Sequence, residues 1–498
     1  MAKTATTPQP EAEAPVAPPA SHDTTPPAAL LEFMVEGWKP ASTKPPPKVR
    51  GHERFAARRK ALSALFPGET LLIPTGHEKT RANDTTYRFR PGSDFYYFTG
   101  NLEPDCVLAL VPRVGGGHES LLFVEPNPGH SDATFYTDRS KGELWVGPRL
   151  GVDKSAIRYA VARASGLPEL PAFLRSLNDG ARHPWRVLRG HDAQVDGALP
   201  KQDDRDRQLG EACSGLRLLK DALEVRELQA AIASTRRGFE DVIRALPGAR
   251  SEREVEGVFN LRARVEGNDV GYNTIAASGP NACILHWMKN DGALKKGTLL
   301  LLDAGVEANS LYTADITRTL PISGRFSKEQ REIHELVLTA QEAAFAAVKP
   351  GNDFLEPNRA AMTVLAHGLE ELGILPCSAE EALRDDRQFY KRYSLHNVSH
   401  MLGIDVHDCA QARLEAYKFG KLRPGMVLTV EPGLYFQLDD LTVPVRYRGI
   451  GVRIEDDVLV TAKGMKNLSA AIPRKTADVE RWIASCWAKA KGKKGPRR

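Results

Sequence analysis

The stretch LLLLDAGVEANSLYTADITRTLP, residues 299–321, places two carboxylates where the sequence otherwise predicts a buried core. Its four leading leucines indicate a buried strand, and that strand ends on Asp303. Asp315 follows twelve positions later, inside a second run with strand character, residues 312–320. An isolated ionised carboxylate is very costly to bury and would take up a proton instead. Two acids in these positions therefore indicate a function beyond packing.

Acids and histidines recur in the same way in the second half of the chain. The strand-like stretch MVLTVEPGLYF carries Glu431 just before a Pro-Gly pair, and GVRIEDDVLVT carries Glu455 in its middle. Alternation along a strand would place Arg453 and Glu455 on the same face. Shortly before these stretches, SLHNVSHMLGIDVHD contributes three histidines, His396, His400 and His407.

Four carboxylates and one imidazole, converging from separate strands, would form a set of hard, mostly oxygen ligands. Such a set suits two divalent cations that share bridging carboxylates, and the cations would let the acids stay ionised in a core. Each residue has an ordinary explanation by itself. A strand-end aspartate more often forms a turn or cap, and residues 455–457 would suit a solvated edge strand. The joint pattern favours a metal centre.

Length and composition indicate a globular protein with several domains. A chain of 498 residues is expected to form about three, and 42% hydrophobic with 26% charged residues is an ordinary globular composition. Residues 1–48 are expected to be a disordered Pro/Ala-rich leader, of which the apolar patch LLEFMVEGW could dock onto the body. We expect a mixed α/β domain at 49–215, a larger domain holding the acids at 216–475, and a basic tail at 476–498.

Two helices followed by several strands occur twice in the larger domain. Apolar residues at helical spacing, Pro-Gly endings and a capping box of Ser327 with Gln330 mark the helices. They are expected at residues 221–246, 251–267, 328–348 and 358–372. Strands follow each pair, so the pattern predicts an internally duplicated α/β domain whose strands meet in the middle.

Cysteine usage, hydropathy and charge limit the cellular setting. Six cysteines are scattered without a C-x-x-C pair, which indicates a reducing compartment and predicts a cytoplasmic location. No apolar run approaches the roughly 20 residues of a membrane helix. The formal net charge is +5, and the last ten residues supply six positive charges, so the remaining chain is nearly neutral. No membrane and no specific nucleic-acid partner is expected, and the basic tail is interpreted as a solvated terminus.

Taken in order, the acid-bearing stretches resemble the pita-bread metallopeptidase family, which includes aminopeptidase P, prolidase and methionine aminopeptidase. A further stretch, AASGPNACILHWMKN, is similar to the family's substrate-side histidine segment and holds His286. In the smaller domain, TRANDTTYRFRPGSDFYYFTGNLEPDCVLALVP and DRSKGELWVGPRLG resemble the amino-terminal domain of aminopeptidase P. The implied fold is α/β: an N-terminal mixed α/β domain followed by a pita-bread (duplicated α+β) catalytic domain.

The resemblance implies a metal-binding role for five residues. Asp303 would chelate one ion, His400 and Glu431 would bind the other, and Asp315 and Glu455 would bridge both. We expect two divalent ions, with manganese first and zinc, cobalt or iron as alternatives.

The resemblance also implies roles on the substrate side. His286 and His407 would contact the scissile peptide and stabilise its developing charge. His396 would line the substrate pocket, and Glu431 would also shuttle a proton. Arg453 would orient a carboxylate ligand from behind.

The implied activity is that of a metalloaminopeptidase that releases the N-terminal residue from peptides with proline in second position. A dinuclear centre with a bridging hydroxide would carry the reaction, and a homodimer or homotetramer is implied. Prolidase, a dipeptidase with the same site, is the nearest alternative. Creatinase, which works without metal on this fold, and a non-catalytic binding module of the same fold are less favoured, because all five ligand positions are retained.

Two departures from the family pattern stand in these motifs. The spacing between Asp303 and Asp315 is one residue longer than the usual spacing of these two aspartates in the family. The extra residue most simply lengthens the turn between the strands. Asn397 stands where many members have glycine. Neither departure removes a ligand.

Overall fold

The structure, a computed structural model, describes residues 26–83, 85–178 and 184–492. The chain divides into two compact units. The first comprises residues 1–56 and 68–201, and the second comprises residues 57–67 and 202–498. Residues 1–25 of the expected leader and 493–498 of the expected tail lie outside the described residues.

The first unit is built on a five-stranded mixed sheet in the order β6-β5-β4-β1-β7. The inner strands pair antiparallel, and the outer strands β6 and β7 run parallel to their neighbours. Its apolar core includes the fully buried Leu72, Val107 and Leu174. The strands are β1 (Thr70–Pro74), β4 (Val107–Pro112), β5 (His118–Val124), β6 (Arg163–Gly166) and β7 (Trp185–Val187), with a separate pair β2 (Thr80–Ala82) and β3 (Thr85–Thr86).

Helices of the first unit are short. They are α1 (Ala28–Val35), α3 (Ser93–Thr99), α4 (Thr134–Thr137), α5 (Glu143–Val146), α6 (Gly151–Arg158), α7 (Leu170–Asn178) and α8 (Ala193–Ala198), while α2 (His52–Leu65) contributes to both units. The apolar patch predicted to dock, which includes α1, does contact this unit. The Tyr136 hydroxyl donates to the Met34 carbonyl at 2.7 Å, and the Trp38 ring lies 4.7 Å from that of His130.

The second unit contains two pairs of long helices and four small antiparallel sheets, in the orders β12-β10-β9, β11-β8, β13-β16-β17 and β14-β15. The helices are α9 (Asp203–Arg217), α10 (Ala222–Ala245), α11 (Glu252–Glu266), α12 (Lys328–Ala347), α13 (Glu356–Glu371), α14 (Ala379–Leu383) and α15 (Thr476–Gly492). The strands are β8 (Asp269–Val270), β9 (Ile275–Ser278), β10 (Leu299–Asp303), β11 (Val306–Glu307), β12 (Thr317–Pro321), β13 (Val427–Val430), β14 (Gly433–Tyr435), β15 (Gly451–Arg453), β16 (Asp456–Thr461) and β17 (Gly464–Asn467).

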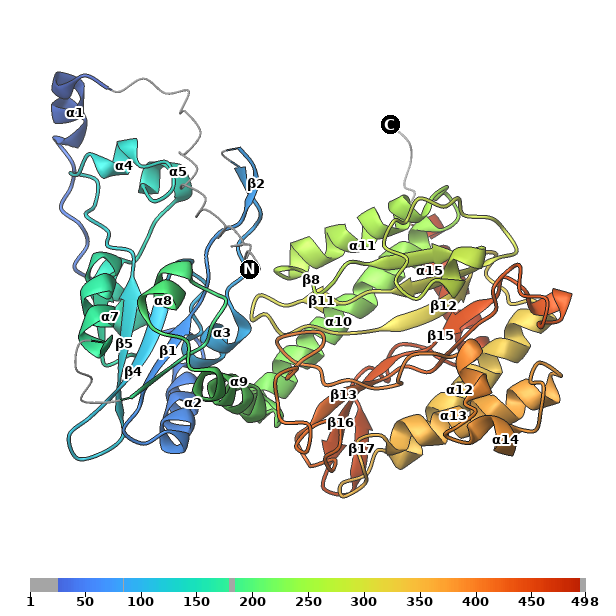
Figure 1. The fold of residues 1–498 in the computed structure, drawn as a ribbon. Helices are drawn as coiled ribbons and strands as arrows, with labels where there is room; N and C mark the ends of the chain where they lie inside the picture. The colour runs from blue at the N-terminus through green and yellow to red at the C-terminus, as the bar shows by residue number, and fades with distance from the viewer. Residues whose placement is uncertain (1–25, 84, 179–183, 493–498) are drawn as a thin grey trace, which may run out of the picture. The chain divides into compact units, whose positions relative to one another are not determined.

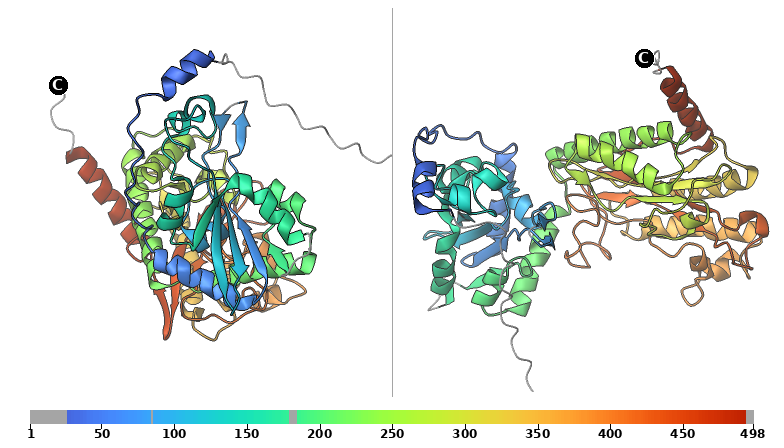
Figure 2. Two further views of the ribbon diagram at one scale, coloured as in Figure 1. Left: turned by 90° about the vertical axis from the view of Figure 1, so that its left-hand side faces the viewer. Right: turned by 90° about the horizontal axis from the view of Figure 1, so that it is seen from above.

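The strands β12 and β15 lie between the helix pairs α10/α11 and α12/α13, and β13, β16 and β17 lie beside α12/α13 (Figures 1 and 2). The first helix of each pair begins with a capping box, Asp221 with Glu224 in α10 and Ser327 with Gln330 in α12. Each capping box satisfies two of the N–H groups at the helix start that lack an intrahelical partner. The apolar faces of both pairs join one core cluster that includes Phe239. The predicted duplicated architecture is confirmed.

Two of the predicted acids occupy breaks between strands. Asp315 was expected within a strand, but β12 begins at Thr317, and Asp315 precedes it. Glu455 lies between β15 and β16, not in the middle of a continuous strand. A residue at such a break is released from the strict alternation of a strand, so its side chain can turn toward a common centre.

Residues 476–492, expected as part of a basic tail, form α15. Ile483 and Cys486 are buried, and the Trp487 indole N–H donates to the Ile243 carbonyl of α10 at 2.7 Å. The segment therefore packs as a helix and is not a solvated terminus as far as Gly492.

Candidate metal centre

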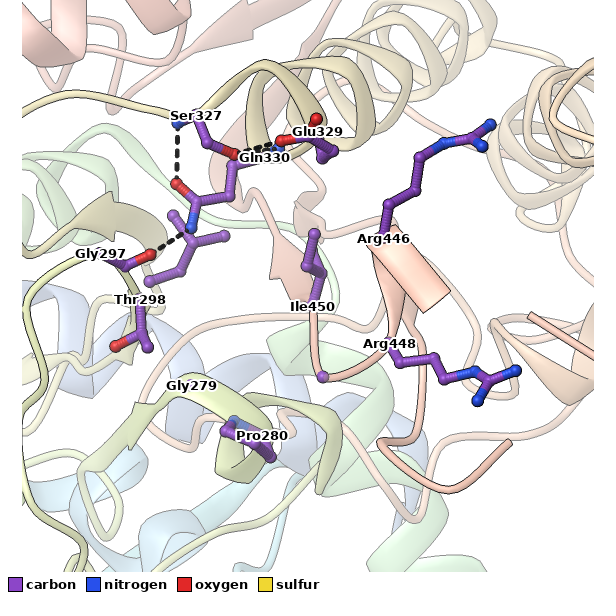
Figure 3. A pocket seen from close by; sticks show the side chains of 12 residues that line it. Gly279, Pro280, Gly297, Thr298, Ser327, Glu329, Gln330, Arg446, Arg448 and Ile450 are labelled. Carbon is purple, nitrogen blue, oxygen red and sulfur yellow. Dashed lines mark hydrogen bonds between the residues drawn. The ribbon is translucent and has the colours of Figure 1, made fainter. Parts of the chain in front are cut away.

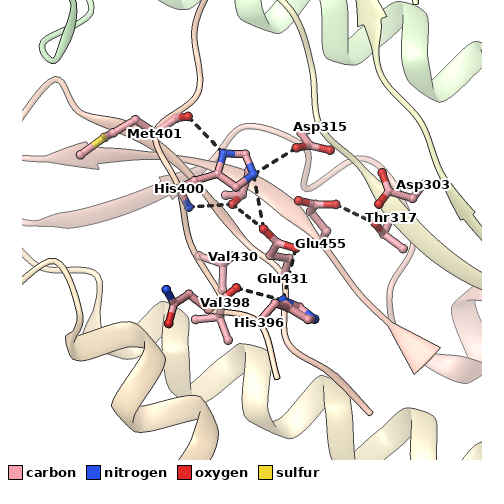
Figure 4. Close-up of polar contacts among 12 residues, drawn as sticks. Asp303, Asp315, Thr317, His396, Val398, His400, Met401, Val430, Glu431 and Glu455 are labelled. Carbon is pink, nitrogen blue, oxygen red and sulfur yellow. Dashed lines mark hydrogen bonds and ion pairs between the residues drawn. The ribbon is translucent and has the colours of Figure 1, made fainter. Parts of the chain in front are cut away.

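Asp315, His400 and Glu455 each offer one ligand atom, and these three atoms lie within 4.8 Å of one another. His400 Nε2 is 3.3 Å from Asp315 Oδ2 and 3.4 Å from Glu431 Oε1 (Figure 4). Local hydrogen bonds hold each of these groups in place. Segments that are more than 100 residues apart in the sequence thus meet at one point in the second unit.

The orientation of His400 is fixed on its far side. Its Nδ1 lies 3.1 Å from the Met401 carbonyl, so Nδ1 carries the proton and donates it. The backbone N–H of His400 donates to Thr429 Oγ1 at 3.2 Å, and the backbone N–H of Glu431 donates to the Val398 carbonyl at 2.9 Å. These contacts align β13 with the histidine segment and point Nε2 toward the acids, as a metal ligand requires.

Asp303 is held from two directions. Its Oδ2 accepts a hydrogen bond from Arg453 Nη2, and its Oδ1 accepts one from the Tyr272 hydroxyl at 2.6 Å. The same hydroxyl lies 2.5 Å from Asp315 Oδ1. A single phenol proton cannot serve both carboxylates at once, so the site holds more acceptors than donors at this position.

The electrostatics of the cluster show an excess of buried negative charge. Burial raises the pKa of Asp303, and it raises the pKa of Glu431 to about 7 despite the charge of His400. Burial and the neighbouring carboxylates raise the pKa of Glu455 well above its ordinary value. Burial lowers the pKa of His400, but the hydrogen bond to Asp315 and the charge of Glu431 outweigh burial and raise it to about 9.

The residues present fit divalent cations. His400 and Arg453 are the positive partners close to Asp303, Asp315, Glu431 and Glu455, so the four acids are not neutralised by protein charges alone. Oxygen donors with one imidazole are the ligands that Mn²⁺, Zn²⁺, Co²⁺ and Fe²⁺ accept in proteins. The donor set therefore matches the chemistry expected of two bridged ions.

The other predicted site residues surround this cluster. His396 Nε2 lies 2.8 Å from the Tyr435 hydroxyl, which also accepts from Arg453 Nη1 at 2.9 Å. The rings of His400 and His407 lie 4.4 Å apart, and His407 is exposed. His286 is exposed too. Burial and then the charge of Arg453 lower the pKa of His396, and burial and then the charge of His400 lower the pKa of His407.

Four residues that support the site were not predicted from the sequence: Tyr272, Thr317, Tyr435 and Asp457. A lone tyrosine near a strand has no periodic signal that separates a site residue from a core residue. Asp457 was considered only as part of a solvated edge, yet β16 is the central strand of its sheet and Asp457 is completely buried. Its Oδ2 accepts from the Asp315 N–H at 3.2 Å, so it supports the segment that carries that ligand.

A cavity of ≈ 260 Å³ elsewhere in the second unit is separate from this cluster (Figure 3). It lies beside the start of α12, and none of the four acids lines it. Gln330 and Ser327 there bond each other in the capping box, and Gln330 Nε2 also donates to the Gly297 carbonyl at 2.8 Å. The acids, not this cavity, therefore define the candidate site.

Comparison with known proteins places the chain in a family. Residues 226–462 match metallopeptidase family M24, and residues 55–185 match the aminopeptidase P N-terminal domain. Xaa-Pro aminopeptidase 1 of Streptomyces coelicolor is 50% identical over 460 residues, which cover 92% of each chain.

Solved structures agree with the sequence relatives. Aminopeptidase P from Escherichia coli with the inhibitor Pro-Leu matches with a TM-score of 0.77 at 32% identity, covering 88% of this chain and 99% of that one. The aminopeptidase PepP of Pseudomonas aeruginosa matches with a TM-score of 0.78 at 34% identity, covering 89% and 99%. The chain therefore belongs to metallopeptidase family M24 and, within it, to the aminopeptidase P family.

Proposed function

We propose that this chain is an Xaa-Pro aminopeptidase, which hydrolyses the bond between an N-terminal residue and a following proline. The observation that carries the proposal is the gathering of ligand-type side chains around Asp315, His400 and Glu455, whose ligand atoms lie within 4.8 Å of one another. Glu431 lies 3.4 Å from His400, and Asp303 shares the Tyr272 hydroxyl with Asp315. The relatives named Xaa-Pro aminopeptidase support the substrate class.

In this proposal Asp303 would hold one metal ion, His400 and Glu431 would hold the other, and Asp315 and Glu455 would serve both. When bound, the ions would polarise the scissile carbonyl and supply a nucleophile at neutral pH. Manganese is proposed first, and zinc, cobalt and iron suit the same donors. Loss of activity on chelation and its recovery with each metal in turn would identify the metal.

Glu431 is proposed to move a proton from the nucleophile to the leaving proline nitrogen. A general acid or base must lie within hydrogen-bond reach of the proton that it moves, and Glu431 Oε1 lies 3.4 Å from Nε2 of the proposed ligand His400. His396 Nδ1 lies 3.7 Å from Glu431 Oε2, on the side away from His400. The Glu431 carboxyl therefore stands between a metal-ligand histidine and a pocket histidine.

His286 and His407 are proposed to donate hydrogen bonds to the carbonyl oxygen as it gains charge. Both are exposed, so a substrate can reach them. Arg453 is proposed to orient Asp303, which it contacts directly. The acidic surroundings would bind the free α-amine of the substrate, which limits removal to the first residue. Proline has no N–H to satisfy, so a shallow apolar pocket accepts it without leaving a buried donor unpaired.

The cellular setting remains a set of proposals. We propose a cytoplasmic enzyme that acts on peptides, as a homodimer or homotetramer, without a membrane or specific nucleic-acid partner. All six cysteines are unpaired thiols, which supports a reducing compartment. Among the described residues, no helix is both long and apolar enough to cross a membrane. Light scattering of the purified protein would determine the oligomeric state.

Prolidase activity is the alternative that a direct test must separate. Manganese-loaded protein is incubated with Xaa-Pro dipeptides and, in parallel, with longer peptides that begin Xaa-Pro. Release of the first residue from the longer peptides is the expected result. Cleavage confined to dipeptides would instead assign a dipeptidase, and no cleavage of either with any of the four metals would favour a non-catalytic module.

A further inference from the structure

One buried carboxylate ties the segment that carries His286 to the start of α11. Glu252 is the first residue of α11, a position that usually faces solvent, yet it has no exposed surface. Its side chain accepts four hydrogen bonds of 2.7–2.9 Å. The donors are the Ser278 N–H, Asn281 Nδ2, the Trp287 indole N–H and the Gly292 N–H.

These four donors take the place of a counter-ion. Among the described residues, no lysine or arginine side chain pairs with Glu252. Several N–H donors can stabilise a buried carboxylate in its ionised form, and such charge-assisted bonds are stronger than neutral ones. Removing the acceptor would leave one buried and three partly buried donors without this partner, which is more costly than losing an ordinary contact.

The donors are placed along the segment so that both of its ends are held. Ser278 lies at the beginning of residues 278–292 and Gly292 at the end, where the Glu252 N–H also donates to the Gly292 carbonyl at 2.9 Å. A Cβ added at Gly292 would lie 2.5 Å from Asn281 Nδ2 and 2.7 Å from Glu252 Oε1, so a larger residue there would displace the side chains that make these hydrogen bonds. Trp287, whose indole N–H also donates to Glu252, directly follows His286 in the sequence.

His286 itself has little to hold it. Its side chain is exposed, and among the described residues its ring makes no hydrogen bond. Its position is therefore set by the backbone of the segment. Trp287 also packs against the small core cluster that contains Tyr435, whose hydroxyl contacts His396. The Glu252 contacts thus connect the His286 segment to the pocket wall.

We propose that Glu252 is a positioning residue for catalysis: it fixes the backbone that presents His286 to the scissile carbonyl. The inference rests on the proposed function, in which His286 stabilises charge on the carbonyl oxygen. A group that acts mainly in the transition state affects kcat more than KM when it is displaced. A substitution of Glu252 that shifts the His286 backbone should therefore lower kcat, by part of the amount that removal of the His286 side chain would.

The test is a double-mutant cycle on the full-length, metal-loaded enzyme with Glu252→Gln, His286→Ala and both together. Glutamine keeps the size of the side chain but turns an NH₂ group toward two of the donors. We expect Glu252→Gln to lower kcat by about tenfold or more with a smaller change in KM. In the His286→Ala background, Glu252→Gln should cause no further loss, because the positioned group is already absent. Metal affinity, measured by calorimetry, should be unchanged in the two single variants, Glu252→Gln and His286→Ala.

Two further variants keep the test decisive. Glu254→Gln changes an exposed glutamate two residues along the same helix and should leave kcat unchanged. Trp287→Phe keeps an aromatic ring, although a smaller one, and removes one of the four donors. Trp287→Phe should lower kcat by a smaller factor than Glu252→Gln does. In the His286→Ala background it should not change kcat. If Glu252→Gln does not fold, the Trp287→Phe cycle carries the test.

The outcomes separate this inference from the proposed function. If His286→Ala retains full activity, the role assigned to His286 is wrong, and the positioning role falls with it. If His286→Ala is impaired while Glu252→Gln and Trp287→Phe are fully active, the positioning role alone is overturned. Additive losses in the cycle, or a loss of metal affinity in Glu252→Gln, would show a merely structural residue and overturn it equally.

Discussion

Thr317 and Glu455 form two hydrogen bonds with each other and so connect the two halves of the duplicated domain. The Thr317 hydroxyl donates to Glu455 Oε2 at 2.6 Å, and the Glu455 N–H donates to the Thr317 carbonyl at 3.1 Å. The same hydroxyl accepts a hydrogen bond from Arg453 Nε at 3.2 Å. Thr317 therefore fixes the carboxylate that is proposed to bridge the two ions.

Thr317→Val should weaken metal binding without unfolding the protein. Valine keeps the shape of the side chain but cannot hold Glu455 Oε2, and loss of such a supporting contact typically reduces metal affinity about 10- to 100-fold. Calorimetric titration of metal-free protein with Mn²⁺ measures the effect. Thr339→Val, at an exposed position of α12, is the matched control. Equal affinities in the two variants would contradict a supporting role for Thr317.

Glu431→Gln should abolish turnover while the fold is retained. Glutamine cannot carry the proton, and it is a poorer ligand than a carboxylate, so kcat should fall by at least about 100-fold. The thermal unfolding midpoint of the metal-free variant should stay at or above that of the parent, because a buried carboxyl with a raised pKa is replaced by a neutral group. Glu415→Gln, at an exposed position, is the control. Retained activity in purified Glu431→Gln would refute the assigned role.

Metal affinity should rise with pH through the neutral range. In the metal-free protein, burial raises the pKa of Glu431 to about 7, and neighbouring acids raise the pKa of His400 to about 9. Both groups therefore hold protons near pH 7 that an ion must displace, and since they lie 3.4 Å apart they titrate as a coupled pair.

The proton release can be measured directly. Calorimetry of Mn²⁺ binding near pH 7 in two buffers with different ionisation enthalpies should show protons released on binding. The number should fall as the pH approaches about 9, where His400 is already losing its proton. A constant affinity between about pH 6 and pH 8 would contradict the proposal that His400 and Glu431 are ligands.

Patterns local in sequence predicted the elements well. Apolar spacing, Pro-Gly endings and the capping box of Ser327 with Gln330 placed α10, α11 and α12 within about two residues of their observed limits, because a helix is determined largely by neighbours three and four residues away. Strand limits near the acids were less predictable. Asp315 and Glu455 interrupt strands, and such breaks depend on contacts such as Glu455 N–H to Thr317 that join distant parts of the chain.

The supporting residues of the site could not be predicted for the same reason. Tyr272 contacts Asp303 and Asp315, and Asp457 receives the Asp315 N–H, but neither relationship leaves a local pattern. The run 455–457 contains three consecutive acids, which suggests solvent exposure when read alone. In the structure Asp456 is paired with Arg318 and Asp457 with a backbone N–H, so long-range partners make their burial possible.

Arg318→Ala should destabilise the fold more than any exposed arginine substitution in the second unit. The guanidinium is buried and pairs with Asp456 Oδ1 at 2.8 Å, and it also donates to the carbonyls of Glu455, Pro473 and Ile472. Removing one partner of a buried ion pair typically costs about 3–5 kcal/mol, and here Asp456 would keep only Arg474, whose Nε lies 3.5 Å from Asp456 Oδ2, as a charged partner. Chemical denaturation of metal-free protein measures the change, with the exposed Arg325→Ala as control. A loss no larger than that of the control would show that Asp456 is stabilised without Arg318.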